Sequence, residues 1–253
     1  MNIKRILNSY YRKYNSQQSS RDPVWNLQFA KSNSEKELLA FVVSCYSYGN
    51  IVQINNFIKK FINLANGNVL KFIMEFDPDE FCTNDNFCYR FNTEKDFVDL
   101  ILSIKYIVLK YGSLKSLFLK HYNESDVNIL NALDKFTSEI RSTVRYSKSF
   151  EYLIPVVSKK STCKRLNLFL RWMVRKDSID TGIWSREVDK SKLIIPVDTH
   201  VYKVSRNLGL VSRKSCDIKF AVELTEKLKS FDPLDPVKYD FALCHIGVDK
   251  ILL

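Results

Sequence analysis

The sequence predicts an all-α fold with no sheet of consequence, and three observations support this. Apolar residues recur at the three- and four-residue spacing of helices along most of the 253 residues. Only six glycines and six prolines occur, too few for the many tight turns of an all-β protein. The short apolar stretch Leu193–Val197 contains a proline and has no evident partner strand, so we expect it to be an extended lead-in to a helix.

Helical periodicity accounts for the first part of the chain. The mixed polar and apolar residues near the N-terminus predict a first helix. Gly49 and Gly112 are expected to end two later helices, because glycine is common just past a helix C-terminus. Besides a short turn of helix that begins at Asp77-Pro78-Asp79, the helices expected here cover residues 35–48, 51–64, 93–111 and 125–140.

The second half contains the sharper helix signals. Asp217 is a good N-cap, and Asp235-Pro236 is a good N-cap and first-turn pair. They predict the last two helices, which follow expected helices over residues 161–176 and 198–208. No repeat or low-complexity linker divides the chain, so we expect residues 1–253 to form a single compact domain with two lobes. One lobe comprises about residues 1–145, to which the C-terminal helix can return, and the other about residues 146–253.

The net charge favours an anionic partner. Lysine and arginine total 39 against 28 acidic residues, which gives a net charge of +11. Such a surplus favours nucleic acid first and an acidic membrane surface second, although a generally basic proteome produces the same composition. No apolar run approaches the roughly 20 residues that span a membrane, and no signal peptide is visible. We therefore expect a cytoplasmic protein that does not insert into a membrane.

The cysteines and histidines offer no metal site. The six cysteines include no CxxC pair, and the chain has only three histidines. These spacings match neither a zinc ribbon nor a set of iron–sulfur ligands. We therefore expect no metal, no cofactor and, in a reducing cytoplasm, no disulfide.

The most informative stretch is 159–176, KKSTCKRLNLFLRWMVRK, which contains seven basic residues and no acid. In a helix, Lys164, Asn167, Arg171 and Arg175 fall on one stripe opposite an apolar face. Surface helices usually mix acids with bases, so an acid-free stripe favours a bound anion, and a solvated basic face is the alternative. The residues expected to contact nucleic acid are Lys159, Lys160, Arg165, Asn167, Arg171 and Arg175.

The start of this helix places an amine where it can react. Ser161 or Thr162 can cap the helix, so that Lys164 lies in the first turn beside amide N–H groups that attract phosphate. The positive helix terminus and the flanking cations Lys160 and Arg165 disfavour the ammonium form, and a neutral amine is a nucleophile.

Asp198 is the expected partner of that amine. It precedes a helix, where it can act as an N-cap only, or can also present its second oxygen to a cleft. The extended Leu193–Val197 segment before it is long enough to return to the helix that begins near Lys164.

Together these segments resemble the helix-hairpin-helix base-excision DNA glycosylases, of which endonuclease III is the best-known member. Lys164-Arg165-Leu166-Asn167-Leu168-Phe169-Leu170 resembles the catalytic-lysine helix of that family, Val197-Asp198-Thr199-His200-Val201 its catalytic-aspartate segment, and Phe241-Ala242-Leu243-Cys244-His245-Ile246-Gly247 its late helix. The glycine-poor hairpin is closer to the archaeal 8-oxoguanine DNA glycosylases. The chain also resembles a related, uncharacterised bacterial family, and this likeness extends to Phe41–Asn55 and Tyr89-Arg90-Phe91-Asn92.

The chain departs from the glycosylase pattern at the hairpin. The family's hairpin reads Leu-Pro-Gly-Val-Gly, whereas this chain has Ile154-Pro155-Val156-Val157-Ser158, without glycines that admit a DNA phosphate. A second register lays the hairpin on residues 154–162 and makes Lys160 the nucleophile. We prefer Lys164 because Asn167 and the apolar run then match as well. The C-terminal iron–sulfur cysteines of endonuclease III have no counterparts, since only Cys244 lies near that end.

The resemblance implies a DNA-repair enzyme that flips a damaged nucleotide into a pocket, with Lys164 as nucleophile and Asp198 as catalytic carboxylate. AP-lyase activity would then nick the strand. Trp172 and Trp184 are candidate aromatic walls of the base pocket, although core packing is the favoured interpretation for each. His200 can contact DNA or cap its own helix. We expect a monomer that binds damaged or abasic DNA and is nucleoid-associated when bound.

Two non-enzymatic functions remain open at this point. A nucleic-acid-binding module on the same helical fold would keep the basic stripe without needing both Lys164 and Asp198. A scaffold protein would instead use the basic face to bind an acidic partner. Salt dependence and a nicking assay separate these functions, and 8-oxoguanine as the lesion is an analogy with the family only.

Overall fold

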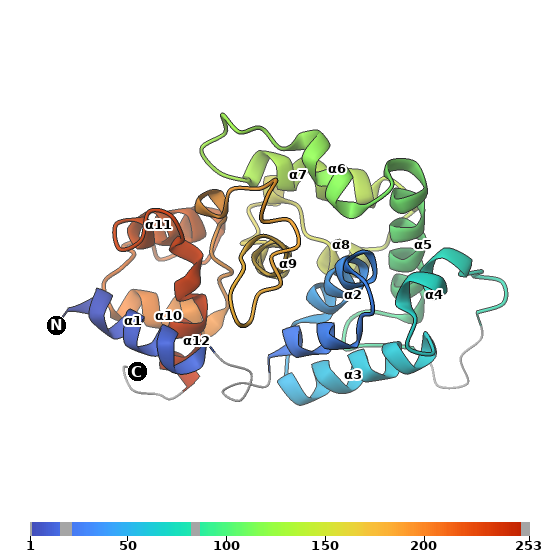
Figure 1. The fold of residues 1–253 in the computed structure, drawn as a ribbon, viewed down its shortest axis with the longest axis horizontal. Helices are drawn as coiled ribbons and strands as arrows, with labels where there is room; N and C mark the ends of the chain where they lie inside the picture. The colour runs from blue at the N-terminus through green and yellow to red at the C-terminus, as the bar shows by residue number, and fades with distance from the viewer. Residues whose placement is uncertain (1, 16–21, 82–86, 249–253) are drawn as a thin grey trace. The chain divides into compact units, whose positions relative to one another are not determined.

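The computed structural model describes residues 2–15, 22–81 and 87–248, and these are mostly helical (Figure 1). Within them no strand forms, and the extended pairings are the isolated bridges Tyr89–Asn92 and Lys176–Thr181. The all-α prediction is therefore confirmed. The chain divides into two compact units: the N-terminal unit, residues 22–125 and 131–156, and the C-terminal unit, residues 1–21, 126–130 and 157–253.

The N-terminal unit is built on one buried helix, α2 (Asn33–Tyr46). Every residue from Leu38 to Tyr46 is buried, because apolar side chains occupy all faces of this part of the helix. Its packing partners are α3 (Ile51–Leu64), α4 (Val69–Glu75) and the 3-10 helix η2 (Pro23–Phe29). The remaining helices of the unit are α5 (Glu94–Tyr111), α6 (Leu114–His121), α7 (Leu130–Arg141) and α8 (Lys148–Leu153).

Capping residues set the boundaries of these helices. Thr93 and Asp96 form a capping box at the start of α5, and Gly112 ends α5 with a left-handed φ of 84°, as predicted. The prediction of Gly49 just past the C-cap was wrong by one residue, since Ser47 is the C-cap of α2 and Tyr48 follows it. Ser113 caps α6, a helix that the sequence patterns did not predict.

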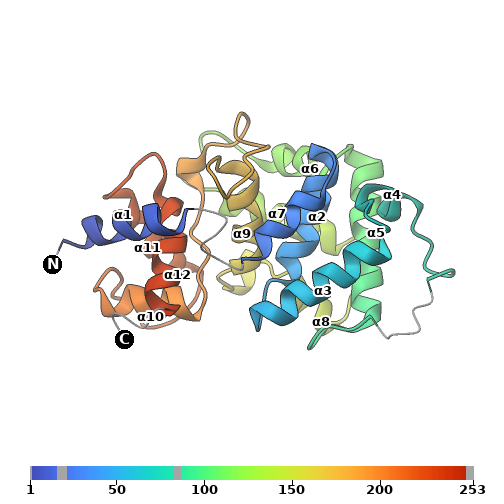
Figure 2. The same cartoon turned by 60° about the horizontal axis from the view of Figure 1, so that its bottom comes forward.

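The C-terminal unit contains α9 (Lys164–Val174), in which all residues after Lys164 are buried. Helix α12 (Asp240–Val248) packs against both α1 (Ile3–Tyr14) and α10 (Thr199–Asn207), as Figures 1 and 2 show. The other elements are α11 (Ile218–Lys229) and the 3-10 helices η3 (Val157–Lys159), η4 (Lys190–Lys192) and η5 (Pro236–Tyr239).

Helix α1 belongs to this C-terminal unit, whereas the sequence pattern grouped it with residues up to 145. Leu7 is fully buried, and the Tyr14 ring stacks on His245 of α12 with 3.8 Å between ring centroids. The apolar face of α1 is thus covered by residues from the opposite end of the sequence. Local periodicity predicts such a face but not its partner.

Candidate active site

Lys164 is the first residue of α9, and its helix begins without a side-chain cap. The N-cap is Cys163, which has a left-handed φ of 48° and makes no side-chain capping bond, so the expected caps Ser161 and Thr162 were wrong. The Ser161 hydroxyl instead accepts from the Cys163 amide at 3.1 Å. Lys164 is half-buried. An uncapped helix start has the positive end of its dipole available to an anion.

Asp198 is the N-cap of α10. Its Oδ1 accepts a hydrogen bond from the Val201 amide at 2.9 Å, and its side chain is half-buried. The preceding segment Leu193–Val197 is extended and buried, which agrees with the expected lead-in. The capping bond uses one carboxylate oxygen, so the second is positioned by the cap but not consumed by it.

The starts of α9 and α10 lie side by side. The Thr162 hydroxyl, two residues before Lys164, is 3.5 Å from the carbonyl oxygen of Val197, which directly precedes Asp198. The Asn167 side-chain amide donates to the Thr162 carbonyl at 2.9 Å and so ties this turn to α9. The two segments singled out in the sequence therefore meet in the structure.

Asp240, the first residue of α12, is a second acid in this region and was missed by sequence reasoning. Burial raises its pKa to about 6; the Arg171 guanidinium and the Lys164 ammonium oppose this rise, and the Asp198 carboxylate adds to it. The charges of Lys164 and Asp198 thus both act on the Asp240 carboxyl. Only its position after the Asp235-Pro236 signal could have drawn attention to it.

The expected phosphate contacts of Arg171 and Arg175 are corrected by the structure. Both side chains are buried, at 2% and 3% exposure, and face carboxylates rather than solvent. Arg171 pairs with Asp180 and Asp240, and Arg175 with Asp177, Asp180 and Asp235. The α9 stripe lacks acids because its counter-ions come from residues outside the helix.

This buried charge cluster comprises two arginines and four aspartates. Burial raises the pKa of Asp180 to about 6, against the opposing effect of Arg171 and Arg175. The coulombic effect of the aspartates raises the pKa of Arg175, although burial opposes it. Removing one partner from such a cluster leaves a charge in a medium of low dielectric constant. The cluster joins α9 to the loop after it, which carries Asp180, and to the starts of η5 and α12, which carry Asp235 and Asp240.

Four other predicted site residues are also buried. Asn167 is 1% exposed and serves the turn before Lys164, and Arg165 is 7% exposed, so neither is placed as a surface contact for nucleic acid. Trp172 and Trp184 are fully buried in the core of the unit, where Trp184 meets the edge of Phe169 at 5.2 Å. Their role as walls of a base pocket is therefore corrected to core packing.

The remaining predicted residues are at the surface. Lys159, Lys160 and His200 are exposed, so their contacts with nucleic acid stay predictions. Lys160 has a left-handed φ of 63°, and its carbonyl accepts from the Ile218 amide at 3.2 Å. The glycine-free turn thus reaches backbone conformations that glycine usually supplies, at a cost in strain.

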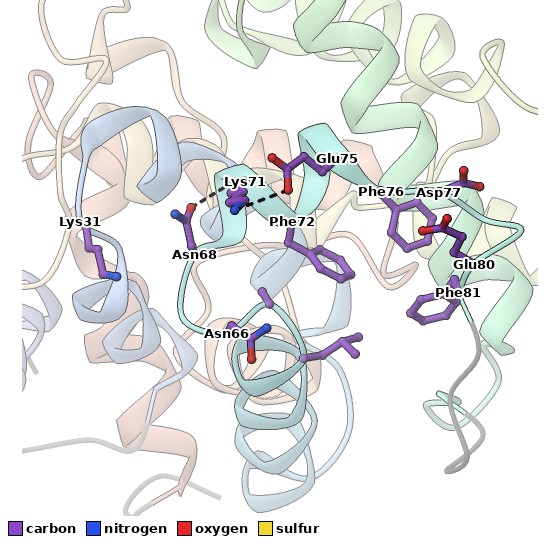
Figure 3. A pocket seen from close by; sticks show the side chains of 12 residues that line it. Lys31, Asn66, Asn68, Lys71, Phe72, Glu75, Phe76, Asp77, Glu80 and Phe81 are labelled. Carbon is purple, nitrogen blue, oxygen red and sulfur yellow. Dashed lines mark hydrogen bonds and ion pairs between the residues drawn. The ribbon is translucent and has the colours of Figure 1, made fainter.

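A pocket of about 580 Å³ lies elsewhere, in the N-terminal unit, and none of the predicted site residues lines it (Figure 3). Three phenyl rings and three carboxylates contribute to its wall, and Lys71 pairs with Glu75 across 3.8 Å. Carboxylates outnumber the two lysines there, which disfavours a phosphate. The lining charged and aromatic residues are Lys31, Lys71, Phe72, Glu75, Phe76, Asp77, Glu80 and Phe81.

The comparisons with known proteins give one match. A family model described as Protein of unknown function (DUF2400) matches residues 22–249. The chain belongs to this family. Lys164, Asp198 and Asp240 all lie inside the matched region. No curated protein and no solved structure matched the chain. Membership of the DUF2400 family therefore covers most of the chain and brings no activity with it.

Two further features concern residues 2–15, 22–81 and 87–248 only. Among them, no group of three or more histidine, cysteine, aspartate or glutamate side chains is arranged to hold a metal ion. No helix within those ranges combines the length and the apolar character needed to cross a bilayer.

Proposed function

We propose that this protein is a DNA glycosylase with AP-lyase activity, in which Lys164 is the nucleophile and Asp198 the catalytic carboxylate. The observation that supports this most is the meeting of two helix starts, joined by the 3.5 Å contact between Thr162 and Val197. One helix start carries a half-buried amine and the other a half-buried carboxylate. An amine beside a carboxylate is the arrangement that covalent catalysis at a sugar carbon requires.

The proposed chemistry begins at the sugar of a damaged nucleotide. The Lys164 nitrogen bonds to C1′ while the glycosidic bond breaks, and the base leaves with the bonding electrons and takes up a proton. Asp198 accepts the proton that the amine loses and stabilises the positive charge that develops on the sugar. Opening of the sugar ring gives an imine. Loss of the C2′ proton and of the 3′-phosphate then cleaves the strand.

The surroundings of the amine are consistent with this division of labour. Asp198 Oδ1 is held by the Val201 amide, so we assign proton transfer to Oδ2. Asp240 is buried and paired with Arg171, which suits a supporting rather than a reacting group. The exposed Lys159 and Lys160 and the net charge of +11 favour DNA as the partner.

Borohydride trapping on abasic DNA tests this proposal. The hydride reduces the imine to a stable amine, so wild-type protein should become cross-linked to the strand. Lys164→Gln should lose the cross-link, while Lys160→Gln, which removes an exposed lysine four residues earlier, should retain it. Asp198→Asn should slow trapping by about 100-fold or more, because it removes a proton acceptor.

Two other outcomes would contradict Lys164 as the nucleophile. Trapping that is lost in Lys160→Gln and kept in Lys164→Gln would assign the nucleophile to the other register. Wild-type protein that binds DNA but never becomes cross-linked to any abasic or damaged strand would leave a non-catalytic nucleic-acid-binding module as the function.

A further inference from the structure

The N-terminal unit carries a cluster of two exposed aromatic rings and one half-buried ring, with a cation among them. We call Tyr48, Arg90, Phe91 and Tyr152 the aromatic platform. Phe91 is 63% exposed and Tyr152 47% exposed. The Phe91 ring meets the Tyr152 ring edge-on at 5.8 Å and lies parallel to the Tyr48 ring at 6.5 Å. Large rings at this exposure leave apolar surface in contact with water, and that surface leaves water only when a ligand or partner covers it.

The Arg90 guanidinium is part of the same surface. Its central carbon lies 5.4 Å from the centroid of the Phe91 ring and 5.8 Å from that of Tyr48. The side chain passes over Gly49, where an added Cβ would clash with guanidinium nitrogen Nη1. That nitrogen ends a flexible side chain and can shift, but the φ of 95° at Gly49 disfavours any residue with a Cβ there.

The turn that presents these groups is strained and firmly held. Arg90 has a left-handed φ of 51°, an unfavourable conformation for a residue with a Cβ. The backbones of Tyr89 and Asn92 exchange two hydrogen bonds of 2.9 Å across the turn. The Tyr48 hydroxyl donates to Asn92 Oδ1 at 2.6 Å. Backbone strain that the surroundings hold in place is typical of functional sites.

A buried acid anchors the turn to the helices behind it. Asp96 is fully buried and accepts from the Ser147 hydroxyl at 2.6 Å and from the Thr93 amide at 2.8 Å. Burial raises its pKa, but these hydrogen bonds outweigh burial and lower the pKa below its ordinary value. Asn92 donates to the carbonyl of Ser149 at 2.8 Å, and Ser149 lies in α8, the helix that carries Tyr152. The platform is thus pre-organised before any ligand arrives.

We propose that the aromatic platform binds an unpaired nucleotide of a DNA strand. The base stacks on the face of Phe91 and meets Tyr152 edge to face, because these two rings are nearly perpendicular, and the phosphate pairs with Arg90. Exposed π-faces beside a guanidinium match a ligand that has both a flat ring and a negative charge, which a nucleotide combines. The choice of DNA rests on the proposed function, but the stacking does not depend on the chemistry at Lys164.

Two strands with the same number of phosphates test the stacking. One is a short oligothymidylate, and the other has an abasic analogue at every position. We expect Phe91→Ala to weaken binding of the oligothymidylate by about 5- to 150-fold, since stacking of each base is worth roughly 1–3 kcal/mol. Binding of the base-free strand should not change. Arg90→Gln should weaken binding of both strands. Phe91→Trp should bind the oligothymidylate about as tightly as the wild-type protein, because tryptophan keeps a ring on which a base can stack.

A matched control lies in the same unit. Tyr106 is 47% exposed and has Lys110 over its ring at 5.4 Å, so it reproduces the chemistry of the platform without the turn. Tyr106→Ala should leave both affinities unchanged. Unchanged affinity for the oligothymidylate in Phe91→Ala, or equal losses in Phe91→Ala and Tyr106→Ala, would overturn the proposal.

The same variants separate this inference from the proposed function. If borohydride trapping persists while Phe91→Ala changes the affinity for neither strand, the platform is refuted and the proposed enzyme activity stands. A Phe91-dependent preference for the oligothymidylate in a protein that never becomes cross-linked would refute the enzyme and leave the platform as part of a binding module.

Discussion

At the scale of single residues, the acids that surround Arg171 and Arg175 give α9 its place in the fold. Each guanidinium is nearly inaccessible and meets at least two aspartates. Such pairs offset desolvation costs of several kcal/mol for each ion, so they contribute little net stability while intact. They become strongly destabilising when one member is removed, because its partners then remain charged and buried.

We therefore expect Arg171→Gln to lower the free energy of unfolding by about 3–5 kcal/mol, because Asp180 and Asp240 lose their shared cation. Lys159→Gln, which changes an exposed lysine, is the control and should alter it by less than about 0.5 kcal/mol. Urea denaturation measures both values. Equal stability of the two variants would show that the charge cluster is not closed in solution.

The sequence predicted the position of Lys164 and Asp198 but not the environment of the two arginines. A helix start and an N-cap are local features, which depend on residues within one turn. The counter-ions of Arg171 are nine and 69 residues away in the chain. An acid-free helix face indicates a ligand surface only if no other part of the chain covers it. The local sequence pattern does not show whether another segment covers the face.

At the scale of elements, α10 couples the carboxylate to the fold. Asp198 both caps this helix and supplies the oxygen that we assign to chemistry. A cap held by one oxygen fixes the orientation of the other, so the helix positions the site. Asp217 at the start of α11 is a cap to which we assign no chemistry. Its carboxylate accepts a hydrogen bond from the Phe220 amide at 3.1 Å and pairs with Arg213.

Two substitutions at Asp198 should separate capping from chemistry. Asp198→Asn should preserve stability, because asparagine caps as well as aspartate, whereas Asp198→Ala should lower the free energy of unfolding by about 1 kcal/mol. Both should lose trapping to a similar degree. Thermal denaturation and trapping on the same preparations check this. Full trapping by Asp198→Asn would show that the residue is only a cap.

Most helices were predictable, while the short ones were not. The pattern over residues 51–64 gave α3 with its bounds, and Thr93 and Asp217 were recognised as caps. α6 and α8 have only eight and six residues, too few turns for a clear apolar period. The last helix also differs, because Asp235 gives its carboxylate to Arg175 and caps nothing with it.

At the scale of the whole molecule, the positive net charge predicts binding that depends strongly on salt. The charge is +11, but Arg171 and Arg175 are neutralised internally and do not contribute to a surface. Contacts with phosphate must therefore come from exposed cations such as Lys159 and Lys160. Each such contact on duplex DNA adds about 0.9 to the slope of log affinity against log salt.

We expect Lys159→Gln and Lys160→Gln each to reduce that slope by about 0.9 and to weaken binding equally on all sequences. Lys71→Gln removes a similarly exposed lysine beside the acidic pocket of the N-terminal unit and should leave the slope unchanged. Fluorescence anisotropy over a series of salt concentrations gives the slopes. Identical slopes in all three variants would move the DNA contact away from the start of α9.

Lys164 is proposed to make the covalent bond to DNA, and identifying the modified residue tests this most directly. Wild-type protein is reduced with borohydride on abasic duplex DNA, and the adduct is digested and mapped by mass spectrometry. We predict that the reduced sugar is attached to Lys164 and to no other lysine. Attachment to Lys160, or to several exposed lysines at once, would contradict the account.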